Sequence, residues 1–167
     1  MPPSSLFSAR GPLGITQVAG SLAVLSIAVC LTGCASAVRR QVVNPPGISP
    51  LVPAYSVAIR HGDMVFLSGM TGIKPGTRAI VEGGVAAQTR QTLENIRTSL
   101  QTAGATMADV GECTVFLVDM TDYAAMNAVY LEFFPVDPPA RATLAVSALP
   151  GPAARVEIKC SAVIGRR

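Results

Sequence analysis

Two consecutive prolines, Pro138 and Pro139, impose the strongest local constraint on this 167-residue chain. A proline fixes its own φ and drives the preceding residue towards extended backbone, so a helix cannot continue across the pair. The apolar segment 142–146 that follows is therefore predicted to be a strand, with Arg141 at its mouth. A guanidinium binds a carboxylate or phosphate through parallel hydrogen bonds. Arg141 is thus a candidate anion-binding residue, and the simpler alternative is a solvated arginine.

The remaining elements are predicted from periodicity and turn residues. Apolar residues at spacings of three and four predict helices over 85–103 and 122–134, and the aromatic stripe of the second helix is expected in the core. Strands are predicted where β-branched and aromatic residues cluster between turns. These strands are 55–60, 64–69, 79–81, 112–118 and 156–164. The order indicates an α+β fold with two helices on one face of a mixed sheet.

The first 34 residues have the composition of an export signal. Arg10 supplies a positive charge, and the apolar run over 18–31 has the length of a signal-peptide core, which is short for a membrane span. The sequence Leu31-Thr32-Gly33-Cys34 follows and resembles the lipobox of bacterial lipoproteins. That resemblance implies cleavage before Cys34 and a lipid on this cysteine. The alternative is an uncleaved anchor helix.

This processing divides the chain into a lipoprotein signal peptide over 1–33, lipidated Cys34 with a flexible linker over 34–49, and a folded domain over 50–165. Ala35 after the cysteine resembles the residues of lipoproteins kept in the outer membrane. We therefore expect the domain on the periplasmic side of the bacterial cell envelope, attached to the membrane through the lipid.

Charge and cysteine content exclude several classes of function. The domain has eight Lys and Arg against ten Asp and Glu, a net charge of −2, which disfavours nucleic acid as a partner and a ribonuclease activity. His61, the only histidine, lies in a turn, and neither Cys113 nor Cys160 has metal-site spacing, so no metal or other cofactor is expected. The two cysteines are expected as small core residues, and a disulfide between them is the alternative.

Seven segments, in order and at compatible spacing, resemble the RidA/YjgF family of reactive-intermediate deaminases. They are Tyr55-Ser56, Ser68-Gly69, residues 87–95, 114–117 and 127–130, Pro139-Ala140-Arg141 and Val156-Glu157-Ile158. The resemblance covers 50–165 and implies a chorismate-mutase-like fold. It also implies a homotrimer with active sites in the clefts between subunits.

The same resemblance implies hydrolysis of enamines and imines of 2-amino acid origin to 2-keto acids and ammonia. It assigns Arg141 to the substrate carboxylate and Glu157 to orienting or activating water. The residues that line or support the pocket by this resemblance are Tyr55, Ser68, Asn127 and Thr143. Met70, Thr143 and Lys159 differ from the residues common in the family and are expected to bear on substrate preference.

The residue types fit this chemistry. A 2-imino acid carries a carboxylate beside an electrophilic carbon, so an arginine can both hold it and orient its C=N bond towards water. A carboxylate within hydrogen-bond reach can take the proton from that water, and no cofactor is required. The alternative function is a non-catalytic trimeric lipoprotein of the envelope that binds a small metabolite or acts as a scaffold.

Overall fold

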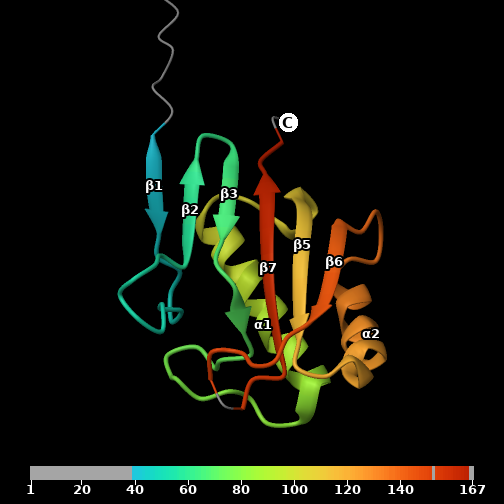
Figure 1. Ribbon diagram of the computed structural model, residues 1–167. Helices are drawn as coiled ribbons and strands as arrows, with labels where there is room; N and C mark the ends of the chain where they lie inside the picture. Colours follow the sequence, from blue (N-terminus) through green and yellow to red (C-terminus); the bar gives the residue numbers. More distant parts are fainter. Residues whose placement is uncertain (1–38, 152, 166–167) are drawn as a thin grey trace, which may run out of the picture. The chain divides into compact units, whose positions relative to one another are not determined.

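One β-sheet with two α-helices packed on one face forms the domain in the computed structural model, which describes residues 39–151 and 153–165 (Figure 1). The strands are β1 (Arg40–Val43), β2 (Ala58–His61), β3 (Met64–Leu67), β4 (Met70–Thr71), β5 (Val110–Leu117), β6 (Ala140–Ala145) and β7 (Val156–Val163). The helices are α1 (Gly84–Thr102) and α2 (Tyr123–Phe133), and short 3-10 turns at Met107–Asp109 and Met120–Asp122 precede β5 and α2. The predicted α+β class and the single helical face are confirmed.

The strand order is β1-β2-β3-β7-β5-β6, and β4 pairs with β7 beyond β3. β5 and β6 run parallel, whereas the other paired strands are antiparallel, so the sheet is mixed as predicted. The C-terminal strand β7 is therefore central, between β3 and β5, and β6 forms an edge (Figure 1). This arrangement places Glu157 in the middle of the sheet and Arg141 at its edge.

The core lies between the sheet and α1. Leu93, Ile96 and Leu100 recur on one face of α1 and are fully buried against the sheet, where Val115 of β5 and Ile158 of β7 are also fully buried. Each such aliphatic side chain contributes roughly 1.5–3 kcal/mol of transfer free energy on burial. Alternate residues of β5 and β7 supply this face, so their intervening residues point to the face that carries no helix.

Short strands differ most from the prediction. Residues 40–43 form β1 and pair with β2, although the segment 34–49 was expected to be a flexible linker. Val43 is buried, but a strand of four residues gives too short an alternation to be recognised in sequence. The predicted strand at 79–81 is wrong, because only an isolated bridge between Ile73 and Ile80 forms there.

Cys113 and Cys160 lie opposite each other in β5 and β7, and a disulfide joins them. Both are about 1% exposed and face the helices. The prediction of two unbonded core cysteines is therefore wrong, and the alternative, a disulfide between them, is the observed arrangement. The bond ties the strand that carries Glu157 to the strand that pairs with β6.

Candidate functional site

Glu157 lies in β7 on the helix-free face, with Thr71 and Phe116 as its neighbours across the two adjoining strands. Its side chain is half-buried, and this desolvation raises the pKa of its carboxyl group. Within the described part of the chain, no cation pairs with this carboxylate. A partly buried carboxylate without a compensating charge lowers stability, and such groups concentrate at functional sites.

Gly69 makes room for this carboxylate. It lies in the turn between β3 and β4, where a Cβ atom would overlap Glu157 Oε1 and approach Glu157 Cδ to 2.7 Å. Any larger residue at this position would therefore displace the Glu157 side chain. The glycine of the Ser68-Gly69 motif is therefore needed because a side chain at this position would occupy the space of the Glu157 carboxylate.

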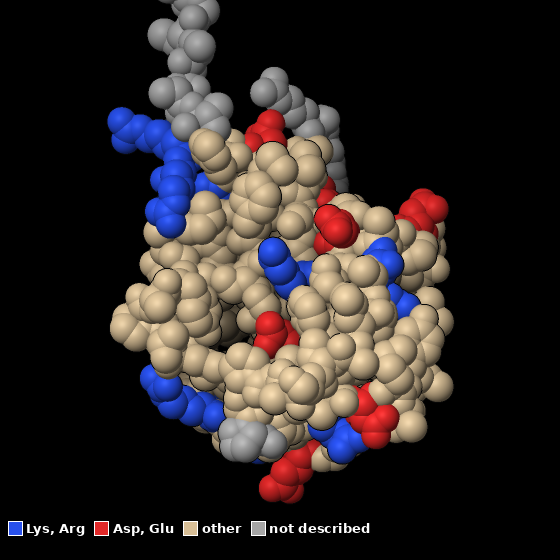
Figure 2. Space-filling view, in the orientation of Figure 1, with Lys and Arg blue, Asp and Glu red and all other residues tan. Residues whose placement is uncertain are grey.

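A cleft of about 860 Å³ opens beside Glu157. Tyr55, Ser68 and Gly69 line it together with Glu157, so the structure brings these predicted site residues to one place. Ser68 Oγ donates a hydrogen bond to the Ser56 carbonyl oxygen at 2.7 Å, and the Tyr55 hydroxyl oxygen accepts one from a backbone N–H at 2.8 Å. Figure 2 shows a hollow on this face beside an acidic side chain, in surroundings that carry few charges.

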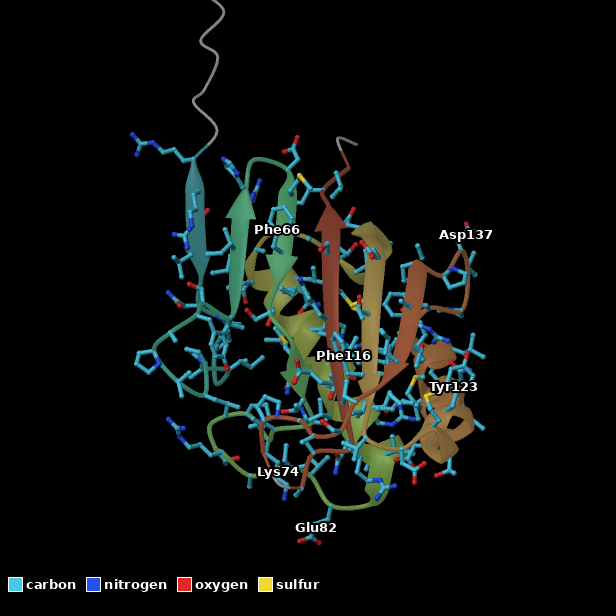
Figure 3. The ribbon with its side chains drawn as sticks, in the orientation of Figure 1. Phe66, Lys74, Glu82, Phe116, Tyr123 and Asp137 are labelled. Carbon is cyan, nitrogen blue, oxygen red and sulfur yellow. A yellow bond between two sulfur atoms is a disulfide. The ribbon has the colours of Figure 1, made fainter. Side chains whose placement is uncertain are left out.

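Arg141 lies in β6 and faces the side of the sheet that carries the helices. Its guanidinium carbon is 4.6 Å from the ring centre of Tyr130 and 5.8 Å from that of Tyr123, and Nη2 donates to the Tyr123 hydroxyl at 3.3 Å. Stacking of this kind contributes about 0.5–2 kcal/mol. A hydrogen bond from Asn127, and then the charge of Arg141, lower the pKa of Tyr123. Asn127 therefore supports Arg141 through Tyr123, whose place on α2 is labelled in Figure 3.

The two predicted catalytic residues lie on opposite faces of the sheet. Arg141 pairs with Cys113, whose side chain faces the helices, whereas Glu157 pairs with Phe116 on the other face. Thr143 follows Arg141 by two residues and shares its face. The predicted site residues thus form two groups. Glu157, Tyr55 and Ser68 line the cleft, whereas Arg141 and Thr143 lie in β6 and Asn127 lies in α2. Within one subunit, Arg141 and Glu157 do not meet.

The tyrosines beside Arg141 were missed as site residues because the aromatic stripe of this helix was expected in the core. Tyr130 is buried, and burial raises its pKa to about 12, so its ring faces Arg141 as an uncharged surface. Tyr123 is 38% exposed and is not a core residue. The aromatic stripe is an ambiguous signal, because its spacing is the same whether a ring fills the core or supports a guanidinium.

Two further observations concern the described residues alone. They contain no group of His, Cys, Asp or Glu side chains that could hold a metal ion. They also contain no helix that is both long and apolar enough to cross a membrane. Cys34 and the predicted signal peptide over 1–33 lie outside the described residues.

The fold and the cleft define a chorismate-mutase-like α+β protein, and comparisons with known proteins identify its family. Residues 48–164 match the sequence profile of the family described as Endoribonuclease L-PSP. The chain belongs to this family, whose members include the RidA/YjgF proteins that its motifs resemble. The predicted family membership is confirmed.

Individual relatives agree with this assignment. The chain is 37% identical over 134 residues to Reactive Intermediate Deaminase A, chloroplastic, of Arabidopsis thaliana. The aligned residues cover 80% of this chain and 71% of the relative. It is 35% identical over 130 residues to the 2-iminobutanoate/2-iminopropanoate deaminase of Rattus norvegicus, covering 78% and 94%. The crystal structure of E. coli TdcF with bound serine has a TM-score of 0.70 and 30% identity, covering 75% and 99%.

Proposed function

We propose that this protein hydrolyses 2-imino acids and their enamine tautomers to 2-keto acids and ammonia, in sites that two subunits of a homotrimer form together. The observation that carries the proposal is Glu157, a half-buried carboxylate that lies at a cleft and has no ion-pair partner among the described residues. The deaminase names of the Arabidopsis and rat relatives support this reaction class. The bound serine in TdcF supports a ligand of amino-acid size.

The uncovered face of the sheet supports assembly. Phe66, Leu144 and Val163 point away from the helices and are 41%, 46% and 56% exposed. Figure 3 labels Phe66 on this face. An apolar sheet face without a covering layer is a common protein–protein interface. A neighbouring subunit that covers this face with its β6 edge would bring its own Arg141 to the cleft beside Glu157. Assembly would thereby complete a site that one subunit holds only in part.

The proposed reaction follows from these two groups. Arg141 of the neighbouring subunit binds the substrate carboxylate and fixes the C=N bond next to Glu157. Glu157 takes a proton from a water molecule, the water oxygen bonds to C2, and the C=N electron pair moves to nitrogen. Glu157 returns this proton to the nitrogen, which gives a neutral carbinolamine with a hydroxyl and an amino group on C2. Glu157 then takes the proton of the C2 hydroxyl and transfers it to the amino nitrogen. The C–N bond breaks as the oxygen electron pair forms the carbonyl, and ammonia leaves as NH3.

The test generates 2-iminopropanoate in situ and follows its loss in the presence of residues 35–167. We expect acceleration over buffer, and a fall in kcat/KM of about 100-fold or more for both Arg141→Ala and Glu157→Gln. Arg97→Ala, which removes an exposed arginine from α1, is the matched control and should leave the rate unchanged. A folded protein that gives no acceleration would contradict the deaminase and favour the non-catalytic binding or scaffold protein. Unchanged activity in Arg141→Ala would contradict the mechanism.

We further propose that Cys34 carries a lipid that holds the domain at the periplasmic side of the envelope, in the outer membrane. The proposal is supported by the lipobox-like sequence before Cys34 and by the disulfide, since such bonds persist in oxidising compartments. Expression with labelled palmitate should label the full chain and leave Cys34→Ser unlabelled. Equal labelling of the two proteins would refute lipidation at this residue.

A further inference from the structure

We propose that the cleft selects 2-imino acids with large apolar side chains, such as the imines of methionine and phenylalanine, over the imine of alanine. The inference rests on the proposed deaminase function and adds the substrate class. Its first support is size, because a volume of about 860 Å³ lies in the range of sites that enclose drug-sized ligands. The imine of alanine is a three-carbon molecule and would fill a small part of it.

The walls of the cleft favour an apolar occupant. Beyond Glu157, the surfaces presented to it come largely from apolar residues, including Ile48, Val52, Val57 and Ile73. Arg78 is the other charged residue among the described residues that line the cleft. It is exposed, and its Nη1 atom donates to the Leu51 carbonyl oxygen at 2.9 Å, so one of its donors is already engaged by the wall itself.

Two loops that line the cleft contact each other. The backbone N–H of Gly76 donates to the Gly47 carbonyl oxygen at 2.6 Å, next to the bond between Arg78 and Leu51. A Cβ atom at Gly47, where φ is 71°, would already approach Pro75 Cβ to 3.2 Å, so the loops are in close contact. A pre-formed wall costs a ligand little ordering free energy, which favours tight binding of a side chain that fills the space.

The proposed position of the substrate directs its side chain into this space. Its carboxylate is bound by Arg141 of the neighbouring subunit, and its C2 atom lies beside Glu157. The side chain is the remaining substituent on C2, and the cleft runs from Glu157 to the 47–52 and 75–78 loops. Each additional buried methylene group adds favourable transfer free energy, so a larger apolar side chain binds more tightly.

The test compares imines that a D-amino acid oxidase produces from D-alanine, D-methionine and D-phenylalanine. Because C2 of an imine is planar, the configuration of the starting amino acid does not matter. Semicarbazide competes for each imine, and the loss of semicarbazone formation gives kcat/KM. We expect kcat/KM for the two larger imines to exceed that for the alanine imine by about 10-fold or more.

Val52→Trp reduces the space, since Val52 lines the cleft and is 52% exposed, so the fold should tolerate the change. We expect it to lower kcat/KM for the phenylalanine imine by about 10-fold more than kcat/KM for the alanine imine. Val136→Trp is the matched control, because Val136 is 76% exposed and does not line the cleft. It should leave kcat/KM unchanged for both the phenylalanine imine and the alanine imine.

The outcomes separate the two proposals. Acceleration of no imine at all would contradict the deaminase function itself. Acceleration of the alanine imine with no advantage for the larger ones would overturn the inference and leave the function standing. A preference for the acidic imine that D-aspartate oxidase makes from D-aspartate, which Arg78 could attract, would also overturn it. Equal losses for both substrates in Val52→Trp would show that the cleft does not hold the side chain.

Discussion

The carboxylate of Glu157 is desolvated without a compensating charge in its own described chain, and this has a consequence for stability. Its pKa is raised in the folded protein, so the folded state holds the proton more tightly than the unfolded state does. Stability therefore falls as pH rises from the ordinary value of 4.5 through the raised pKa. At pH values above both the ordinary and the raised pKa, the desolvated carboxylate lowers the free energy of unfolding by its full amount. Gly69, which leaves space for the carboxylate, keeps this arrangement in place.

Glu157→Gln should accordingly raise the melting temperature of the dissociated subunit near neutral pH, where no Arg141 of a neighbour lies beside the carboxylate. The gain should shrink as pH falls through the raised pKa and vanish below 4.5, where the native carboxyl is protonated in both states. Thermal unfolding across this pH range measures the effect. Glu82→Gln is the control, because Glu82 lies on an exposed loop, and it should show no such pH-dependent gain (Figure 3). A destabilised Glu157→Gln protein at neutral pH would show that a compensating interaction exists.

At the scale of elements, long periodic segments were predicted well. α1 and β7 carry apolar residues at regular spacing along most of their length, and both form within one or two residues of the predicted bounds. β1 and β4 have four and two residues, and they are stabilised by pairing with strands that are distant in sequence. Such strands depend on tertiary neighbours and leave little local signal.

The sequence predicted which residues form the candidate site but not on which face of the sheet they lie, because the face depends on how the strands pair. The family motifs pointed to Arg141 and Glu157, but their faces depend on the register of β5 with β6 and with β7. A shift of one residue in either register would reverse the face of a side chain. No local pattern around Arg141 contains this information, and the cleft likewise combines loops that meet only in the fold.

The disulfide also depends on the pairing of two strands. Cys113 and Cys160 are 47 residues apart, and their approach depends on the antiparallel pairing of β5 with β7. The bond lies on the helix face, opposite the face that carries Glu157. It joins the two strands on which the relative position of the functional groups depends. Its burial places it in the core, where it supports the sheet without entering the cleft.

For the whole molecule, the proposed shared site would draw on two separate groups of residues in each chain. One group is Glu157 at the cleft, on the central strand β7, and the other is Arg141 on the edge strand β6. Figure 1 shows β6 beside α2. A closed ring of subunits would pair each Arg141 with the cleft of the next subunit, so that each arginine and each cleft takes part in one site. Activity would then depend on assembly and fall on dilution below the dissociation constant.

Mixing two inactive variants tests this sharing of sites. Arg141→Ala and Glu157→Gln should each be inactive alone, yet refolding them together in equal amounts should restore about one quarter of the wild-type activity. A site is complete when its arginine comes from a Glu157→Gln subunit and its glutamate from an Arg141→Ala subunit, and each condition is met half the time. Mixing the separately assembled trimers without subunit exchange is the control and should restore nothing. If co-refolding also restores nothing while mixed trimers form, the proposed shared site is wrong.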